Sequence, residues 1–463
     1  MKYLGNCVTD IKIAYIGGGS RGWAWGLMSD LASAADISGR VDLYDIDYEA
    51  AKANEIIGNR YAELAESKSK WHYRAVGSIE NALCGADFVV ISIIPGTFDE
   101  MECDIHLPEK YGVYQSVGDT TGPGGILRGL RAIPMFEAIA KAIRDCCPNA
   151  WVINYTNPMS ICVRTLYRVF PQIRAFGCCH EVFGTQKLLC QMLENTLGLP
   201  VDDRSEIKVN VTGINHFTWL SEARYRDIDL MPIYRGFCEK YAAQGLLKGK
   251  DDNWMNNHFD CSHRVKMDLF QKHGAIAAAG DRHLAEFCHG KTYLTDPQTA
   301  RSWGFSLTTV AWRKEDLVFR LDKSRKLVSG ELPVAITCTG EEGVEQIRAL
   351  LGLRELVTNV NIPNRGQIPD LPLDAVVETN AVFRASSLTP VFAGNLPQSL
   401  HDPISALVAE QELVVEAGLE RNLDKAFLAF LRDPLVTLDY AQARQLWDEM
   451  LAGSGVYLQS YFN

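Results

Sequence analysis

Short apolar runs alternate with helix-like segments through the first 220 residues of this chain. The runs lie at 11–16, 41–44, 72–76, 87–94, 150–155 and 173–178. Helical patterns lie between them, at positions such as 48–66, 126–145 and 182–197. Strands that alternate with helices pair in parallel, because each helix carries the chain back over the sheet. The alternation therefore predicts an α/β fold with a doubly wound parallel sheet of the Rossmann type, as in lactate and malate dehydrogenases.

A glycine-rich turn follows the first of these strands. Gly17, Gly19 and Gly22 have the spacing G-x-G-x-x-G, with Ser20 between them, and an amphipathic segment follows. This spacing allows a tight turn and a close approach to a pyrophosphate, whose charge a helix N-terminus attracts. Asp45 ends the next strand, where a carboxylate would bind the ribose hydroxyls of NAD and repel the extra phosphate of NADP. The pattern predicts an NAD site; the alternative is a structural turn beside a surface aspartate.

The pattern changes in the second half of the chain. Longer helical stretches are expected at 233–247, 258–273, 404–432 and 439–452, with a strand-like piece at 333–340. We find no internal repeat and no low-complexity linker. Two domains are expected: an NAD-binding Rossmann domain at 1–200, and an α+β domain at 201–463 for substrate and metal binding and for oligomerisation.

Composition excludes several classes of partner. The 463 residues carry 46 basic and 57 acidic side chains, and the net charge of −11 opposes binding to nucleic acid or to an anionic membrane. Apolar runs such as 88–94 are far shorter than the roughly 20 residues of a membrane-spanning helix. The 13 cysteines show no disulfide spacing, and no signal peptide precedes them. We expect a cytoplasmic protein.

A cysteine and a histidine follow two later strands. Cys179 comes after the run 173–178, and His216 comes after the strand-like segment 207–214. Ligands of an open α/β sheet collect at the carboxyl ends of the strands, so both side chains could share a crevice with the glycine turn. One thiolate and one imidazole would leave coordination positions open for substrate oxygens. A buried cysteine and a core histidine are the common alternative.

Four short motifs give the chain a resemblance to a known family. They are GGGS after the first strand, NYTNPMS at 154–160, CHEV at 179–182 and GINHF at 213–217. In this order they resemble glycoside hydrolase family 4, whose members depend on NAD and manganese and do not use the usual pair of carboxylates. CHEV is similar to the α-galacturonidase group of that family. The likeness is clear in the first half and continues weakly through 280–287 and 361–382.

The resemblance implies an unusual route to hydrolysis of α-galacturonides. The sugar is oxidised at carbon 3, which acidifies the proton on carbon 2, and the glycosidic oxygen then leaves by elimination. Water adds, and the sugar is reduced again, so NAD is recycled. A divalent metal, Mn²⁺ or another transition ion, acts as a Lewis acid on the sugar oxygens.

The resemblance also suggests roles for individual residues. Cys179 and His216 match the metal ligands, and Asn157 matches a substrate-contacting asparagine. His180 stands where some members have an aspartate proposed as the acid, and histidine can donate a proton near neutral pH. The base is open: the candidates, in order of preference, are Asp281, Asp260 and Asp119.

A uronic acid needs a partner for its carboxylate, and arginine is the usual one. The candidates are Arg131 and Arg282 first, with Arg128 and Arg264 beside them. We expect no nucleic-acid or membrane partner, and a homodimer or homotetramer. Three alternatives remain: the same chemistry on an α-glucuronide, α-galactoside or α-glucoside; a malate- or lactate-type NAD dehydrogenase; and a noncatalytic nucleotide sensor.

Overall fold

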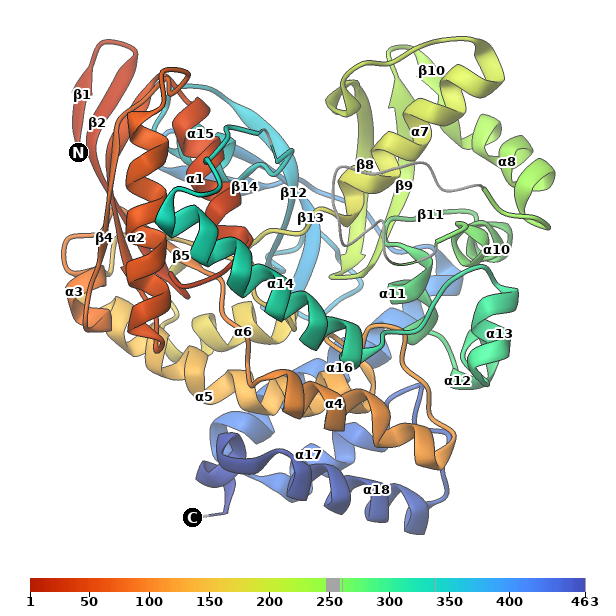
Figure 1. Cartoon of the computed structure of the whole chain (residues 1–463). Coiled ribbons are helices and arrows are strands. Elements are labelled where there is room, and N and C mark those ends of the chain that lie inside the picture. The colour runs from red at the N-terminus through yellow and green to blue at the C-terminus, as the bar shows by residue number, and fades with distance from the viewer. Residues whose placement is uncertain (247–258, 260, 338, 463) are drawn as a thin grey trace.

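A ten-stranded sheet forms the centre of the computed structural model, which describes residues 1–246, 259, 261–337 and 339–462 (Figure 1). The strand order is β14-β13-β12-β7-β6-β5-β2-β3-β4, and β1 pairs with β2. The strands of this sheet are β1 Lys2–Leu4, β2 Cys7–Ile16, β3 Ile37–Tyr44, β4 Trp71–Ala75, β5 Phe88–Ile91, β6 Trp151–Asn154, β7 Arg174–Gly177, β12 Leu356–Pro363, β13 Val376–Arg384 and β14 Ser387–Pro390. The six strands from β4 to β7 pair in parallel.

Helices cover both faces of this sheet, which confirms the doubly wound fold. In β2, Ile13 and Tyr15 face one core cluster, whereas Ala14 and Ile16 face another. The first cluster contains residues of α1 Trp23–Ser33, α2 Tyr48–Glu63 and α15 Gly343–Leu350, and the second contains residues of α3 Ile79–Leu83, α5 Gly122–Cys146 and α6 Met159–Val169. Successive side chains of a strand point to opposite faces, so both faces of β2 are buried.

The second half of the chain extends the same sheet. β12 lies antiparallel to β7, with Asn361 opposite Gly177, and β13 and β14 continue outward from it. The strands β8 Ile207–Ile214, β9 Phe217–Tyr225, β10 Ile228–Asp229 and β11 Ile276–Ala277 form a separate four-stranded sheet. It packs with α7 Glu181–Leu197, α8 Leu230–Tyr241 and α10 Arg264–His273 in the yellow-green lobe of Figure 1.

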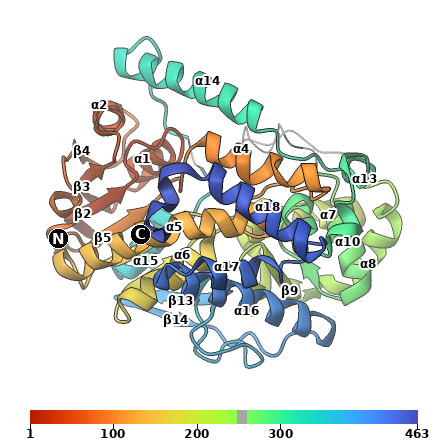
Figure 2. The ribbon, with the colours of Figure 1, turned by 90° about the horizontal axis from the view of Figure 1, so that it is seen from below.

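The last helices pack beneath the large sheet. α16 Gln398–Glu420, α17 Leu423–Phe430 and α18 Tyr440–Gly453 share a core cluster with α5. The other helices are α4 Phe98–His106, α11 Asp281–Glu286, α12 Gly290–Tyr293, α13 Pro297–Ser302 and α14 Val310–Ser329. α14 lies along one edge of the molecule (Figure 2). None of the described helices is long and apolar enough to cross a membrane.

The strand expected at 333–340 is not formed. Residues 333–337, 339 and 340 belong to no strand, and residue 338 lies outside the described part of the chain. The segment bonds to helix α1 instead: the Thr337 N–H donates to Ser29 Oγ at 2.7 Å, and the Thr339 N–H donates to Asp30 Oδ1 at 3.1 Å. Polar side chains of α1 therefore take the place of a neighbouring strand.

Candidate active site

The glycine turn joins β2 to α1 as the sequence predicts. Gly17 has a φ of +91°, and a Cβ at this position would lie 2.1 Å from the carbonyl oxygen of Ser92. No other residue type could therefore occupy position 17 without moving the backbone. The N–H of Ser20 donates to the Gly17 carbonyl at 3.0 Å and closes the turn. α1 follows after Gly22, and no described side chain caps its N-terminus.

Asp45 lies beside this turn. It directly follows β3, and its Oδ2 accepts the N–H of Gly19 at 2.8 Å. Its Oδ1 accepts the N–H of Asp47 at 2.9 Å. The turn, the open helix N-terminus and the carboxylate thus lie together at the carboxyl ends of two neighbouring parallel strands.

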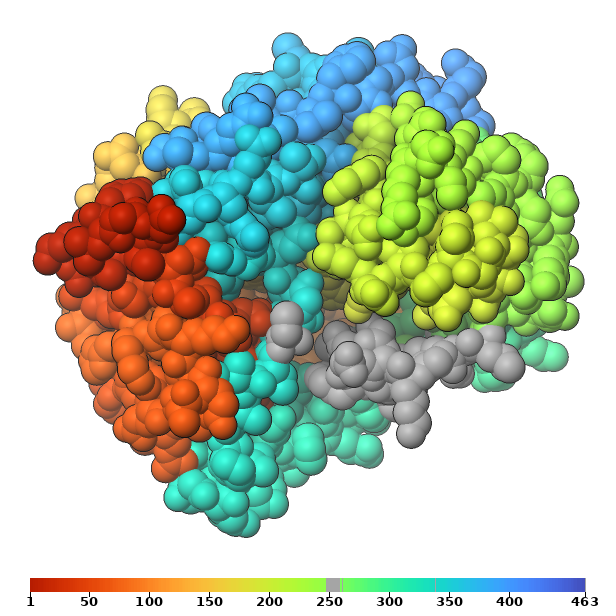
Figure 3. Space-filling model, turned by 90° about the horizontal axis from the view of Figure 1, so that it is seen from above, coloured from red at the N-terminus to blue at the C-terminus, as the bar shows by residue number. Residues whose placement is uncertain are grey.

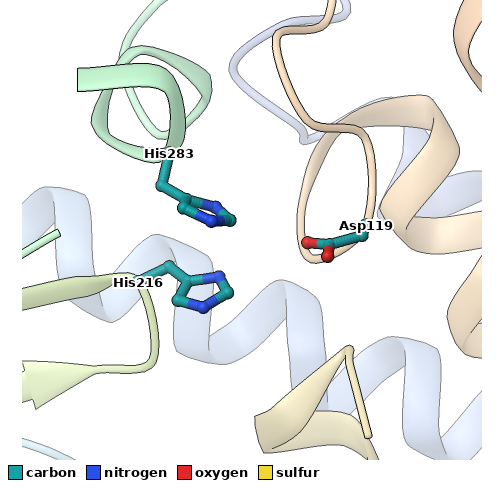
Figure 4. Close-up of side chains that lie close together, drawn as sticks. All are labelled: Asp119, His216 and His283. Carbon is teal, nitrogen blue, oxygen red and sulfur yellow. The ribbon is translucent and has the colours of Figure 1, made fainter. Parts of the chain in front are cut away.

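Three side chains from distant segments meet in a second cluster (Figure 4). Asp119 precedes α5, His216 lies in the turn between β8 and β9, and His283 lies on α11. One ligand atom of each lies within 4.8 Å of the others, and the two imidazole centroids are 3.8 Å apart. Two nitrogens and a carboxylate at this separation form a set of donors suited to a divalent transition metal.

Hydrogen bonds orient these side chains. Thr120 Oγ1 donates to Asp119 Oδ1 at 2.7 Å and lies 3.0 Å from His216 Nδ1. Because the hydroxyl has one proton and gives it to Asp119, His216 donates from Nδ1 and keeps its lone pair on Nε2. Asn157 Nδ2 donates to Asp119 Oδ2 at 3.3 Å. The substrate asparagine of the family pattern is therefore next to the cluster.

The charge state of the cluster favours a cation. Burial and the neighbouring His283 lower the pKa of His216 to about 3, and burial also lowers the pKa of His283. Burial acts to raise the pKa of Asp119, but His283, His216 and Arg128 outweigh it and hold this pKa below its usual range. At neutral pH the cluster consists of two neutral imidazoles and one carboxylate.

Cys179, predicted as a ligand with His216, lies close by but outside this group of three. Its thiol is buried and bonds with Asn215, the residue before His216. Burial, Glu378 and Glu181 raise the pKa of the thiol well above its usual value. A thiolate ligand would need a bound cation to offset these effects. Its role stays a prediction.

Two further residues of the site were not identified from the sequence. His283 lies in the segment 280–287, and Glu181 lies within the CHEV motif, but neither received a role. Glu181 Oε2 accepts the N–H of Gly280 at 2.8 Å, and Oε1 lies 3.8 Å from His283 Nε2. Burial acts to raise the pKa of Glu181, but His283 and His180 lower it to about 2. Glu181 is therefore an anion, and it stabilises the position of His283.

The predicted acid, His180, directly precedes Glu181 in the chain. Its Nδ1 is 3.3 Å from Glu341 Oε1, and its ring centroid is 6.2 Å from that of Trp23, the first residue of α1. His180 therefore lies near the start of α1, and its role as an acid stays a prediction.

The three base candidates have different surroundings. Asp119, the third choice, belongs to the cluster. Asp281, the first choice, is fully buried, and its Oδ1 accepts the N–H of Lys266 in the first turn of α10 at 3.0 Å. Burial and Cys261 raise its pKa to about 7. Asp281 therefore caps a helix and is not part of the three-residue cluster. Asp260 lies outside the described residues.

The four candidate arginines differ in their bonds to the protein. Arg131, a first choice, is 1% exposed, pairs through both terminal nitrogens with Asp104, and donates from Nε to the Pro95 carbonyl. Its guanidinium is therefore paired within the protein, and its role in substrate binding stays a prediction.

Arg282 and Arg264 are also bonded to the protein. Arg282 donates to Ser306, Ser116 and Thr308, and Arg264 donates to the carbonyls of Ala242 and Ser302. Arg282 was the other first choice; these bonds use Nε and Nη2, and its role in substrate binding stays a prediction.

Arg128 differs from the other three. Among the described residues its side chain makes a single hydrogen bond, from Nε to the Asn157 carbonyl at 3.1 Å. It also lies close enough to Asp119 for each to shift the pKa of the other. Arg128 is therefore the best placed of the four candidates.

One face of the molecule is hollowed between the red and cyan segments of the large sheet and the yellow-green lobe (Figure 3). The glycine turn belongs to the large sheet, and the turn that carries His216 belongs to the lobe. The candidate site therefore combines residues from both sheets.

Comparisons with known proteins identify the family. Residues 12–195 match the Family 4 glycosyl hydrolase, and residues 211–436 match the Family 4 glycosyl hydrolase C-terminal domain. The chain is 59% identical to an alpha-galacturonidase of Thermoanaerobacterium saccharolyticum, over 100% of this chain and 99% of that protein.

Solved structures agree in fold. The crystal structure of lplD from Bacillus subtilis is 52% identical with a TM-score of 0.91, and covers 96% of this chain and 100% of its own. A 6-phospho-alpha-glucosidase from gut microorganisms, solved with NAD and Mn²⁺, is 19% identical with a TM-score of 0.77, over 97% and 99% of the two chains. Both halves of the chain match in order and over nearly their full length, and the chain therefore belongs to glycosyl hydrolase family 4.

Proposed function

We propose that this glycoside hydrolase cleaves α-galacturonides by oxidation at carbon 3, elimination, addition of water and re-reduction, with NAD and a divalent ion such as Mn²⁺. The observation that carries the substrate class is the 59% identity, over the full chain, to a relative named alpha-galacturonidase. The CHEV motif at 179–182 supports the same class.

The residues at the glycine turn fit NAD. The turn has no side chain at Gly17 to obstruct a pyrophosphate, and the N-terminus of α1 has no described side-chain cap. Asp45, whose carboxylate lies beside this turn, would accept hydrogen bonds from the ribose hydroxyls. Bound there, NAD would supply a reversible oxidation of the sugar, so no net oxidant is consumed.

The residues of the cluster fit a divalent transition ion. Asp119, His216 and His283 would hold it, with Cys179 as a candidate for a further ligand. Nδ1 of His283 is buried and has no hydrogen-bond partner among the described residues, which is costly unless a ligand uses its lone pair. The ion would supply Lewis acidity to the sugar oxygens beside it.

The protein's own groups would move protons around the sugar. His180, next to Glu341, would hold the proton that the leaving oxygen receives. A base must remove the proton from carbon 2. Since Asp119 would bind the ion, Asp281 and Asp260 remain the candidates for this base.

Arg128 would bind the carboxylate of the uronide. Its Nε bond to Asn157 fixes the guanidinium beside Asp119 and leaves both terminal nitrogens without a partner among the described residues. A guanidinium can bind a carboxylate through two parallel hydrogen bonds, which a neutral galactoside cannot accept.

The substitution Arg128→Met tests this assignment. Hydrogen bonds to charged groups contribute about 2 kcal/mol, so kcat/KM for p-nitrophenyl α-galacturonide should fall about 30-fold or more. The rate with the matching galactoside should change far less. Arg144→Met, at an exposed arginine paired with Asp145, is the matched control. Equal losses on both substrates would remove Arg128 from the specificity role, and preference of the unmodified enzyme for the galactoside would overturn the substrate class.

The dehydrogenase alternative makes a different prediction for NAD. A glycosidase that recycles the cofactor needs only a trace of NAD, and NADH does not accumulate as substrate is consumed. Equimolar NADH and oxidised product would point to a dehydrogenase.

We also propose that the protein forms a homodimer or a homotetramer. Light scattering of the purified protein tests this.

A further inference from the structure

A cavity of about 350 Å³ is lined in part by the segments that carry the two histidines of the cluster. Its walls come from α10, α12, α16 and residues 432–434, and they are largely apolar. Two of the wall residues adjoin the cluster in sequence. Phe217 directly follows His216, and Phe287 follows His283 by about one helical turn. The rings of Phe217 and Phe287 stack with centroids 5.1 Å apart, and both residues line the cavity.

A buried carboxyl lines this cavity. Glu410 on α16 is 4% exposed and has no hydrogen bond or ion pair to any described residue. Burial and the nearby Asp433 raise its pKa well above the usual value. A polar group buried without a partner reduces the stability of the fold by roughly 1–3 kcal/mol. A ligand in the cavity would provide the missing partner.

No cation around the cavity forms an ion pair with Glu410. Lys272 pairs with Asp268 at 2.6 Å, and the exposed Arg432, which also lines the cavity, lowers the pKa of Glu410 without reversing the rise that burial causes. Glu410 therefore has a cation in the same cavity but no ion pair or hydrogen bond with a described residue. His273 bonds to Ser399, and His289 caps α12, so neither histidine bonds to Glu410.

We propose that this cavity binds a small primary amine with a compact apolar body, whose ammonium group pairs with Glu410. An ammonium ion in direct contact supplies the ion pair and the hydrogen-bond donors that Glu410 lacks. A cavity of about 150 Å³ can hold a benzene molecule, so this one has room for an aromatic ring and a short arm. Leu269, Leu407 and Phe287 would contact the ring.

The test is calorimetric titration of the purified protein with 2-phenylethylamine at pH 7. We expect saturable binding at one site, with a Kd near or below about 1 mM. The neutral 2-phenylethanol and the anionic phenylacetate should bind at least tenfold more weakly. Glu410→Gln should weaken binding of the amine at least tenfold. Ala406→Trp, at an exposed residue of the cavity rim, should block it while Glu410 remains in place.

Glu412→Gln is the matched control, because Glu412 lies two residues further on α16 and pairs with Arg164 at 2.7 Å, outside this cavity. This variant should bind the amine as the unmodified protein does. Absence of saturable binding, equal binding of the alcohol and the amine, or unchanged affinity in both Glu410→Gln and Ala406→Trp would overturn the proposal. These outcomes do not depend on the glycosidase reaction, so they are distinguishable from failure of the proposed function.

Discussion

At the scale of single residues, the charge states of three side chains determine what the candidate site can bind. His216 and His283 have ring centroids 3.8 Å apart, a separation at which two imidazolium ions would repel strongly. Both are therefore neutral near pH 7 and present lone pairs, and Asp119 supplies the negative charge. This combination repels anions and attracts a metal cation.

The role of His283 predicts the effect of removing it. His283→Ala should weaken Mn²⁺ binding about tenfold or more, because a site with three protein ligands loses one of its nitrogens. Titration of the protein with Mn²⁺, followed by the electron paramagnetic resonance signal of the free ion, measures this. His401→Ala, at a partly exposed histidine beside Asp402, should leave the affinity unchanged. Equal Mn²⁺ affinity in His283→Ala and the unmodified protein would remove His283 from the metal site.

Glu410 predicts a pH dependence of stability. Its pKa is raised above 4.5 in the folded state, so the unfolded chain releases this proton first as the pH rises. The free energy of unfolding should therefore decrease above pH 4.5, by up to about 1.4 kcal/mol per pH unit, until the folded pKa is reached. Glu410→Gln removes this contribution. Urea unfolding at pH 5 and pH 7 should show a smaller loss in the variant, and parallel losses in both proteins would contradict the buried, unpartnered state of Glu410.

The sequence predicted the neighbourhood of the glycine turn better than that of the cluster. The glycines and Asp45 lie within one continuous strand-turn-helix-strand pattern, so local spacing was sufficient to bring them together. The cluster joins Asp119, His216 and His283, and no local pattern shows that these positions meet. The arginines illustrate the same limit. Arg128 and Arg131 are one helical turn apart on α5, and only the packing of Asp104 from α4 shows that Arg131 is already paired.

At the scale of elements, the start of α5 positions Asp119. Asp433, from the segment after α17, accepts the N–H of Gly122 at 2.7 Å and the hydroxyl of Thr121 at 3.1 Å. The loop that carries Asp119 is therefore connected to the C-terminal helices. Burial raises the pKa of Asp433 to about 6, and its hydrogen bonds partly oppose that rise.

Loss of this anchor should affect both stability and metal binding. Asp433→Ala would leave buried donors without a partner, so the free energy of unfolding should fall by about 1–3 kcal/mol. Mn²⁺ affinity should fall as well, because the Asp119 loop loses its support. Chemical unfolding and Mn²⁺ titration measure the two effects. Asp424→Ala, at an exposed position on α17, is the control. A stability loss with unchanged Mn²⁺ affinity would show that the anchor does not position Asp119.

Elements with a regular pattern were predicted correctly, and elements defined by distant partners were not. The parallel strands and the helices α2, α5 and α7 agree with their expected positions to within a few residues. The addition of β12, β13 and β14 to the N-terminal sheet was not foreseen, because it depends on pairing between β12 and β7 across about 180 residues. The segment 333–340 has a strand-like composition, but its partners are side chains of a helix.

At the scale of the whole molecule, both halves of the chain contribute to one site. The glycine turn and Asp119 come from the segment 1–200, whereas His216 and His283 come from the segment 201–463. The boundary expected near residue 200 therefore runs through the candidate site, and the large sheet also crosses it. A reaction that needs a nicotinamide and a metal ion beside the same sugar requires this kind of junction.

The most direct test of the account is the fate of hydrogen at carbon 2 of the sugar. Elimination must remove that hydrogen and replace it from solvent, whereas direct displacement at carbon 1 leaves it in place. Hydrolysis of an α-galacturonide in deuterated water, with NAD and Mn²⁺ present, is followed by NMR of the released galacturonate. The account predicts deuterium at carbon 2 of the product. Galacturonate that is released with its original hydrogen at carbon 2 would contradict it.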